Sequence, residues 1–196
     1  MEYVQRRTAR PTARDQGGLR PDDDAALSAE LAAVVAGARR RAVRDGDRQV
    51  DTAHLLHSLL ETDPQARALV GGAPQLARLL GYLVQRSIGY GLRWQSGVED
   101  SGAIRVVDEQ ASYGGEVKDA GDWSPVAAAA MTDALRRAGQ RGEPRASGTD
   151  LLAALVADPQ SRAVEVLEHT GVPADGLRAR LDALAVEYAD GGRPTC

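Results

Sequence analysis

The three histidines are the residues of this chain best suited to metal or acid–base chemistry. His54 and His57 lie three positions apart, a spacing that presents two imidazoles on one helix face, as a metal site requires. Local hydrogen bonding at a helix start accounts better for His54, and we expect His57 to be exposed. His169 precedes Gly171 near an expected helix end, where a partial positive charge suits the helix dipole. We therefore predict no metal site and no cofactor.

The single lysine excludes several enzyme classes. Lys118 follows Val117 and precedes no Ser or Thr, so no P-loop is present, and no Ser-x-x-Lys pair exists. Ser124 lacks the closing glycine of a nucleophile elbow. We predict that the protein is not an enzyme. The alternative is catalysis by carboxylates and tyrosines between the helical regions, namely Tyr90, Asp108, Glu109 and Tyr113.

Length and composition favour a small helical protein. The chain has 196 residues, enough for one ordinary domain or two small ones. Aromatic residues make up 4% of it and Phe is absent, so the core must consist of Ala, Leu and Val. Because strands draw on β-branched and aromatic residues, this composition favours closely packed helices. We expect an all-α fold.

Charge, cysteine use and hydropathy indicate a cytoplasmic protein. The net charge of −4 gives no support to a nucleic-acid-binding face. Cys196 is the only cysteine, so no intrachain disulfide can form. The N-terminus has no apolar stretch of signal length, and no run approaches the ~18 apolar residues of a membrane span. We expect neither nucleic acid nor a membrane as a partner, and the oligomeric state stays open.

Helical periodicity follows an N-terminal segment, 1–24, that we expect to be a flexible tail. Ser28 is expected to cap the first helix and Gly46 to end it. Its predicted buried face consists of Leu31, Val34, Val35, Ala38 and Ala42. Three more helices are predicted to start at Asp51 or Thr52, at Pro64 and at Pro74. Their expected core residues include Leu55, Leu56, Leu59, Leu60, Leu76, Leu79, Leu80 and Leu83.

The same pattern then returns, which indicates an internal repeat. A shift of 96 in the numbering superimposes helix starts, helix ends and core pairs. The matches are Leu27-Ser28 with Trp123-Ser124, Gly46 with Gly142, and Leu55-Leu56 with Leu151-Leu152. After one deleted residue, Asp63-Pro64-Gln65 meets Asp158-Pro159-Gln160. We predict two copies of a four-helix unit, 25–86 and 123–188, followed by a C-terminal tail, 189–196.

A segment of different composition, 87–122, separates the copies. It is rich in glycine and aromatic residues, and two apolar runs near 90–95 and 103–108 flank a turn region. A small β-hairpin is one interpretation. Trp94 in this segment either packs on the helices or forms part of a partner-binding surface.

With both copies in view, the chain resembles the double Clp-N domain. This is the N-terminal substrate- and adaptor-docking module of the ClpA and ClpC unfoldases. The resemblance covers about 25–190 without most of the linker. The segments that carry it are Trp123-Ser124-Pro125, Val50–Leu56, Val166–Val172 and Leu177-Arg178.

The resemblance implies an all-helical, pseudo-twofold fold with eight helices. No nucleotide motif is present, so we expect a stand-alone copy of the domain or a fragment, without an ATPase module. In ClpC-like relatives a Glu in each cap region helps to bind phosphoarginine. Ala53 and Thr149 stand at those positions, so the usual mode of phosphoarginine binding is not expected. Asp150 is adjacent in the second copy. The phenylalanines that hold cyclic-peptide antibiotics in actinobacterial relatives are absent.

These features predict a non-enzymatic module that binds adaptors, client peptides or other components of the Clp protease system, or competes for them. The alternative is sequestration of a Clp-targeting peptide antibiotic or a similar small ligand. The residues that we expect in the binding site are Thr52, His54, Thr149, Asp150 and Trp94.

Overall fold

The computed structural model describes residues 24–87, 99 and 123–191, and this part of the chain is all-α, as predicted. The elements are η1 (Asp24–Ala26), α1 (Ala29–Asp45), α2 (Thr52–Thr62), α3 (Pro64–Val70), α4 (Ala73–Ser87), α5 (Pro125–Gln140), α6 (Gly148–Leu155), α7 (Arg162–His169) and α8 (Ala174–Gly191). The β-hairpin and Trp94 lie outside the described residues. None of the helices described combines the length and apolar character needed to cross a membrane.

The first helix of each copy starts and ends in the same way. Ser28 and Ser124 cap α1 and α5, and each hydroxyl accepts the backbone N–H three residues later at 3.1 Å. Gly46 and Gly142 follow the helix ends with φ of 74° and 75°, a left-handed conformation that favours glycine. These paired signals are the ones that the shift of 96 superimposes.

The two copies exchange backbone hydrogen bonds reciprocally. The Ser28 N–H donates to the carbonyl of Ala146 at 2.9 Å, and the Ser124 N–H donates to the carbonyl of Val50 at 2.8 Å. The start of each copy is thus bonded to the segment before the second helix of the other copy. The two isolated parallel bridges that result are Leu27 with Ala146 and Val50 with Trp123. The reciprocal contacts agree with the expected pseudo-twofold relation between the copies.

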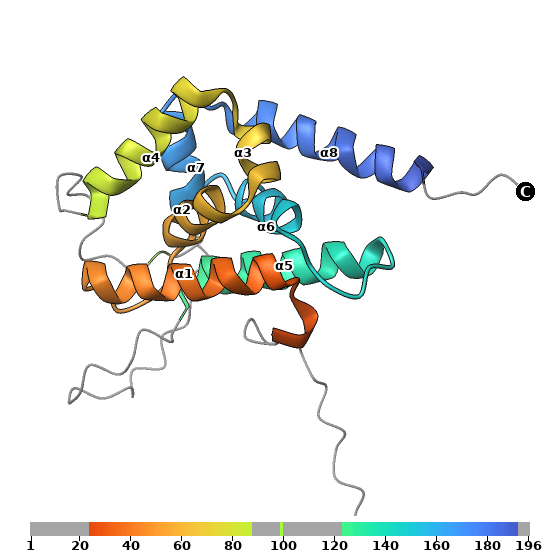
Figure 1. Ribbon diagram of the computed structural model, residues 1–196, viewed down its shortest axis with the longest axis horizontal. Helices are drawn as coiled ribbons and strands as arrows, with labels where there is room; N and C mark the ends of the chain where they lie inside the picture. Colours follow the sequence, from red (N-terminus) through yellow and green to blue (C-terminus); the bar gives the residue numbers. More distant parts are fainter. Residues whose placement is uncertain (1–23, 88–98, 100–122, 192–196) are drawn as a thin grey trace, which may run out of the picture.

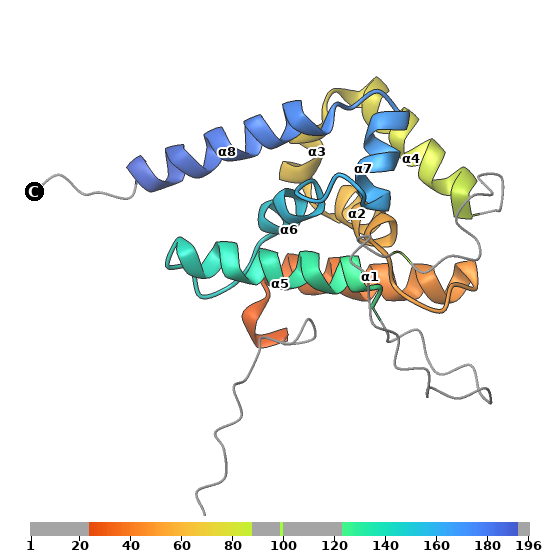
Figure 2. The same cartoon turned by 180° about the vertical axis from the view of Figure 1, so that it is seen from behind.

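The helices form layers, with α2 and α6 at the centre (Figures 1 and 2). α1 and α5 lie in one layer below them, while α3, α4, α7 and α8 lie above, and α8 extends away from the body. One continuous core of mainly Ala, Leu and Val runs through both copies. The largest side chains with less than 2% exposure include Leu55, Leu56, Leu59, Leu151, Leu152 and Leu155.

The central position of α2 corrects one expectation. We expected His57 to be exposed, but it is 3% exposed, and every residue of 52–60 is buried. The spacing of the leucines predicts a helix with one buried face. However, α2 contacts the other helices α1, α3, α4, α5, α6 and α7, so the face opposite the leucines is covered as well.

The third helices differ more than the repeat predicts. Pro64 begins α3, with Asp63 as its cap. Pro159, its counterpart in the sequence alignment, lies in a turn, where the Gln160 N–H donates to Asp158 Oδ1 at 2.8 Å. α7 starts at Arg162 instead, and its cap is a serine hydroxyl from Ser161. Asp63 therefore places a carboxylate at the start of α3, whereas Ser161 places a neutral hydroxyl at the start of α7.

Candidate functional site

The start of α2 carries a capping box that contains a histidine. Asp51 caps the helix, and its Oδ1 accepts the backbone N–H of His54 at 2.8 Å. Nδ1 of His54 reaches back to the Asp51 N–H at 3.1 Å and also lies 2.8 Å from Asp51 Oδ1. When the imidazole is neutral, Nδ1 can accept the hydrogen bond from the Asp51 N–H. When it is protonated, Nδ1–H donates to Asp51 Oδ1 instead. Hydrogen bonding at the cap is therefore the role of His54, as the sequence indicated.

Asp51 and His54 belong to a buried ion cluster. Two guanidinium groups contact Asp51 Oδ2, from Arg86 of α4 at 2.5 Å and from Arg162 of α7 at 2.7 Å. Nε2 of His54 lies 3.1 Å from Asp47 Oδ2. Arg162 belongs to the second copy, so this cluster links the start of α2 to the other half of the molecule.

The charges in this cluster move the pKa values of its members in opposite directions. Burial alone would raise the pKa of Asp51, but the hydrogen bond and charge of His54, with Arg86 and Arg162, hold it well below its usual range. Burial alone would lower the pKa of His54. Hydrogen bonds to Asp47 and Asp51 outweigh burial and raise it to about 9. His54 is therefore a cation at neutral pH.

Protonation of His54 also bears on metal binding. Asp47, Asp51 and His54 bring one ligand atom each within 4.8 Å of one another. A proton on the imidazole and two guanidinium groups on Asp51 already supply the positive charge that these carboxylates require. The geometry is that of an ion-pair cluster, and the prediction that the protein binds no metal remains a prediction.

The start of α6 is the counterpart of this cap with different chemistry. Ser147 caps α6, and Asp150 takes the place that His54 has in α2. Oδ2 of Asp150 accepts the Ser147 N–H at 2.9 Å, and Arg141 forms a two-pronged ion pair with its carboxylate at 2.5 and 2.7 Å. Oγ1 of Thr149 lies 2.9 Å from Oγ of Ser147. Asp150 is thus a structural capping residue.

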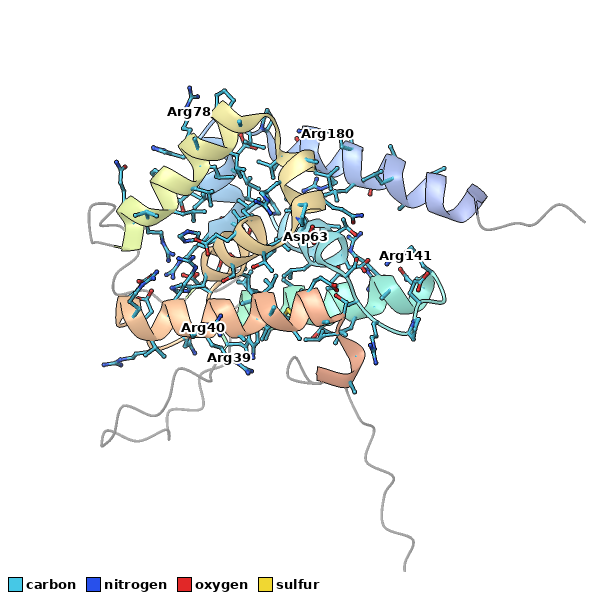
Figure 3. The ribbon with its side chains drawn as sticks, in the orientation of Figure 1. Arg39, Arg40, Asp63, Arg78, Arg141 and Arg180 are labelled. Atoms are coloured by element: carbon cyan, nitrogen blue, oxygen red, sulfur yellow. The ribbon has the colours of Figure 1, made fainter. Side chains whose placement is uncertain are left out.

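A cavity of about 510 Å³ opens beside the start of α6. Its walls come from α3, the end of α5, the start of α6 and the projecting part of α8, and they include Thr149 and Asp150. Arg180 ties α8 to α3 through a hydrogen bond of 2.6 Å to the Leu69 carbonyl (Figure 3). The apolar residues of the lining are Ala68, Leu69, Ala153, Leu181, Leu184 and Ala185.

The predicted site residues therefore separate into two places. Thr149 and Asp150 line this cavity. Thr52 and His54 are 0% and 2% exposed, close to the 3% of Asp150, and form contacts at the other cap. Thr52 also lines a second cavity, of about 400 Å³, together with residues of α5 and α6. Trp94 lies outside the described residues. Trp123, the other tryptophan, packs partly on the core and lies under Arg39, whose guanidinium carbon is 5.5 Å from the ring centroid.

Sequence reasoning missed Glu99. Its side chain is buried among Thr52, Ser124 and Arg162, although it comes from the segment between the copies. These partners are 25 to 63 positions away along the chain. No local pattern marks such a contact, because one carboxylate in a turn-like Gly-Val-Glu-Asp-Ser-Gly stretch resembles any solvent-exposed loop residue.

Comparison with known proteins adds one result on the fold. No family model matches the chain, and no curated protein matches it. A solved structure from "Preliminary structural investigations of a malarial protein secretion system" is similar, with a TM-score of 0.54 and 14% identity. The match covers 83% of this chain and 96% of that chain. At this identity the likeness shows a shared fold.

Proposed function

We propose that this protein is a non-catalytic protein-binding module, related to the N-terminal domains of Clp unfoldases, that acts in the cytoplasm. It docks adaptors or client peptides of the Clp protease system or competes for them. The observation that carries this proposal is the cavity beside the start of α6, because its lining combines apolar side chains with polar and charged ones, Thr149 and Asp150 among them. Ligand-binding pockets commonly pair apolar side chains with a few polar groups that orient the ligand.

Two further observations support the proposal. Two of the segments that resemble the Clp-N domain, Val50–Leu56 and Trp123-Ser124-Pro125, contain the residues of one bridge between the copies, Val50 with Trp123. The similar solved structure comes from a study of a protein secretion system, and a role in handling other proteins agrees with that context.

The experiment compares two arginine substitutions in a binding assay with purified Clp unfoldase, its adaptors and a labelled unfolded client. Ala68 is exposed and lines the cavity, so Ala68→Arg is expected to obstruct it. Ala33 is exposed on α1, away from the cavity lining, so Ala33→Arg is the matched control. Binding that Ala68→Arg abolishes and Ala33→Arg retains supports the proposal. Absence of binding to all of these components refutes it.

The second candidate function is sequestration of a peptide-like small molecule, such as an antibiotic that targets Clp. The volume of the cavity favours it, since about 510 Å³ lies within the ~300–1,000 Å³ of typical small-ligand sites. A thermal-shift screen with such compounds distinguishes the two functions. Stabilisation that Ala68→Arg removes, without binding to Clp components, favours the small ligand.

A further inference from the structure

The carboxylate of Glu99 lies where three helix starts meet. Its Oε2 accepts the Thr52 N–H at 2.9 Å and the Ser124 hydroxyl at 2.8 Å. Its Oε1 accepts the Arg162 N–H at 2.8 Å and the hydroxyl of Thr52. Both oxygens therefore accept two hydrogen bonds each, and the Glu99 residue is only 5% exposed.

The remainder of the fold supplies all four donors. Thr52 is the first residue of α2, Arg162 is the first residue of α7, and Ser124 caps α5. Ser124 and Thr52 are 1% and 0% exposed, so these residues are shielded from solvent. Helix starts carry partial positive charge and unpaired N–H groups, which together favour an anion. The donors are thus arranged around a carboxylate that comes from outside the helices.

The counterpart of this junction in the other half contains its own carboxylate. In the repeat, Gly148 corresponds to Thr52. The carboxylate of Asp63 lies so close to Gly148 that a Cβ at this position would overlap it. Asp63 is labelled near the centre of Figure 3. Asp63 is the cap of α3 and cannot leave without breaking that cap. The matching cap of α7 is Ser161, a neutral hydroxyl, so α7 supplies no carboxylate of its own as α3 does through Asp63. Asp51 is the cap of α2 and pairs with the side chains of Arg86 and Arg162, and Glu99 supplies the carboxylate that accepts from Thr52, Ser124 and the Arg162 N–H.

We propose that the junction of α2, α5 and α7 is an oxyanion-binding site for a carboxylate group, and that Glu99 occupies it as a ligand tethered to the same chain. A free carboxylate such as acetate competes with Glu99 for the four donors. The tether gives Glu99 a high effective concentration, so the native chain binds an external carboxylate weakly. This inference does not depend on the function proposed above.

The test is chemical rescue of Glu99→Ala by acetate, which restores the carboxylate without the tether. Thermal unfolding is followed in sodium acetate and in sodium chloride at equal ionic strength. Glu99→Ala is expected to have a lower Tm than the native chain, because buried donors lose their acceptors. Acetate is expected to raise the Tm of Glu99→Ala saturably and to leave the native Tm unchanged. Chloride has no such effect.

Two controls make the result specific. Glu61→Ala removes a carboxylate that pairs with Arg41 away from the junction, and its Tm is not expected to respond to acetate. Adding Ser124→Ala to Glu99→Ala removes one donor and is expected to weaken the apparent affinity for acetate. Inorganic phosphate is a third arm: rescue by phosphate alone overturns the assignment to a carboxylate.

Other outcomes also decide the proposal. If Glu99→Ala is unfolded in chloride, folding that acetate induces supports it. Failure of acetate to induce folding overturns it, provided that Glu99→Gln, which keeps the shape of the side chain, folds. A Tm of Glu99→Ala equal to that of the native chain, with no response to acetate, also overturns the proposal.

Discussion

Two histidines on adjacent turns of α2 titrate in opposite directions, and together they predict how stability depends on pH. His54 has its pKa raised from 6.5 to about 9, while burial and the nearby Arg41 lower the pKa of His57 from 6.5 to about 4. Between pH 6.5 and 9 the folded protein retains a proton that the unfolded chain releases, so stability falls as pH rises. Between pH 6.5 and 4, His57 binds a proton in the unfolded chain but stays neutral in the folded protein. The free energy of unfolding therefore falls as pH drops.

Each displacement corresponds to about 3 kcal/mol, because one pKa unit is worth 1.36 kcal/mol. The free energy of unfolding is therefore expected to be greatest near pH 6.5 and to decrease on both sides. Asp51 and Glu61 have lowered pKa values, and such carboxyls lose their stabilising contribution only as pH falls below their ordinary values of 3.8 and 4.5. Asp133 also has a lowered pKa and an ordinary value of 3.8, so among the described residues with shifted pKa values the decrease between pH 6.5 and 4.5 is assigned to His57.

The assay is urea unfolding, followed by circular dichroism at several pH values between 4 and 9. Two variants test separately the alkaline limb and the acid limb of the curve of unfolding free energy against pH. His54→Gln keeps a side chain suited to a capping box but cannot titrate, so it is expected to flatten the alkaline limb. His57→Leu replaces a buried imidazole with an apolar side chain, and it is expected to flatten the acid limb. An alkaline limb that persists in His54→Gln, or an acid limb that persists in His57→Leu, would refute the reasoning.

Three further substitutions test the packing. Gly148→Ala is expected to destabilise the fold by about 1–3 kcal/mol or more, because the new Cβ would overlap the Asp63 carboxylate. Urea unfolding measures the loss, and unchanged stability would contradict this geometry. Ser28→Ala removes the cap of α1 and is expected to cost about 1 kcal/mol in the same assay, whereas Ala33→Ser on the exposed face of α1 should change stability by less than about 0.5 kcal/mol. Leu152→Ala leaves a cavity in the core of α6 and is expected to cost about 2–5 kcal/mol, and a smaller loss would show that the core relaxes around it.

Much of the helical structure follows from local signals. The buried face of α1 was predicted residue by residue, and its cap at Ser28 and end at Gly46 are where the sequence places them. Asp51 is the cap of α2, and Pro64 begins α3. These features depend on spacing within one helix or on one residue at its end. Sequence patterns contain that information directly.

The candidate site was less predictable. Thr149 and Asp150 line the cavity beside α8, whereas Thr52 lines a different cavity and the ring of His54 is enclosed in an ion cluster. The difference depends on what covers each cap. In the first copy Arg86 of α4 reaches Asp51, and the second copy leaves a space beside α8. A repeat in the sequence predicts equivalent caps and does not predict which cap neighbouring helices cover.

The sequence by itself determined the all-α class, the cap and end of α1 and the composition of the core, because each depends on residues close together in the chain. Tertiary structure alone decided that α2 is buried on every side, that His57 is internal, and that Glu99 meets Thr52 and Arg162. Such contacts join residues far apart in the chain, and the free energy that selects them comes from packing and from pairing buried donors. Neither quantity is encoded in a local pattern.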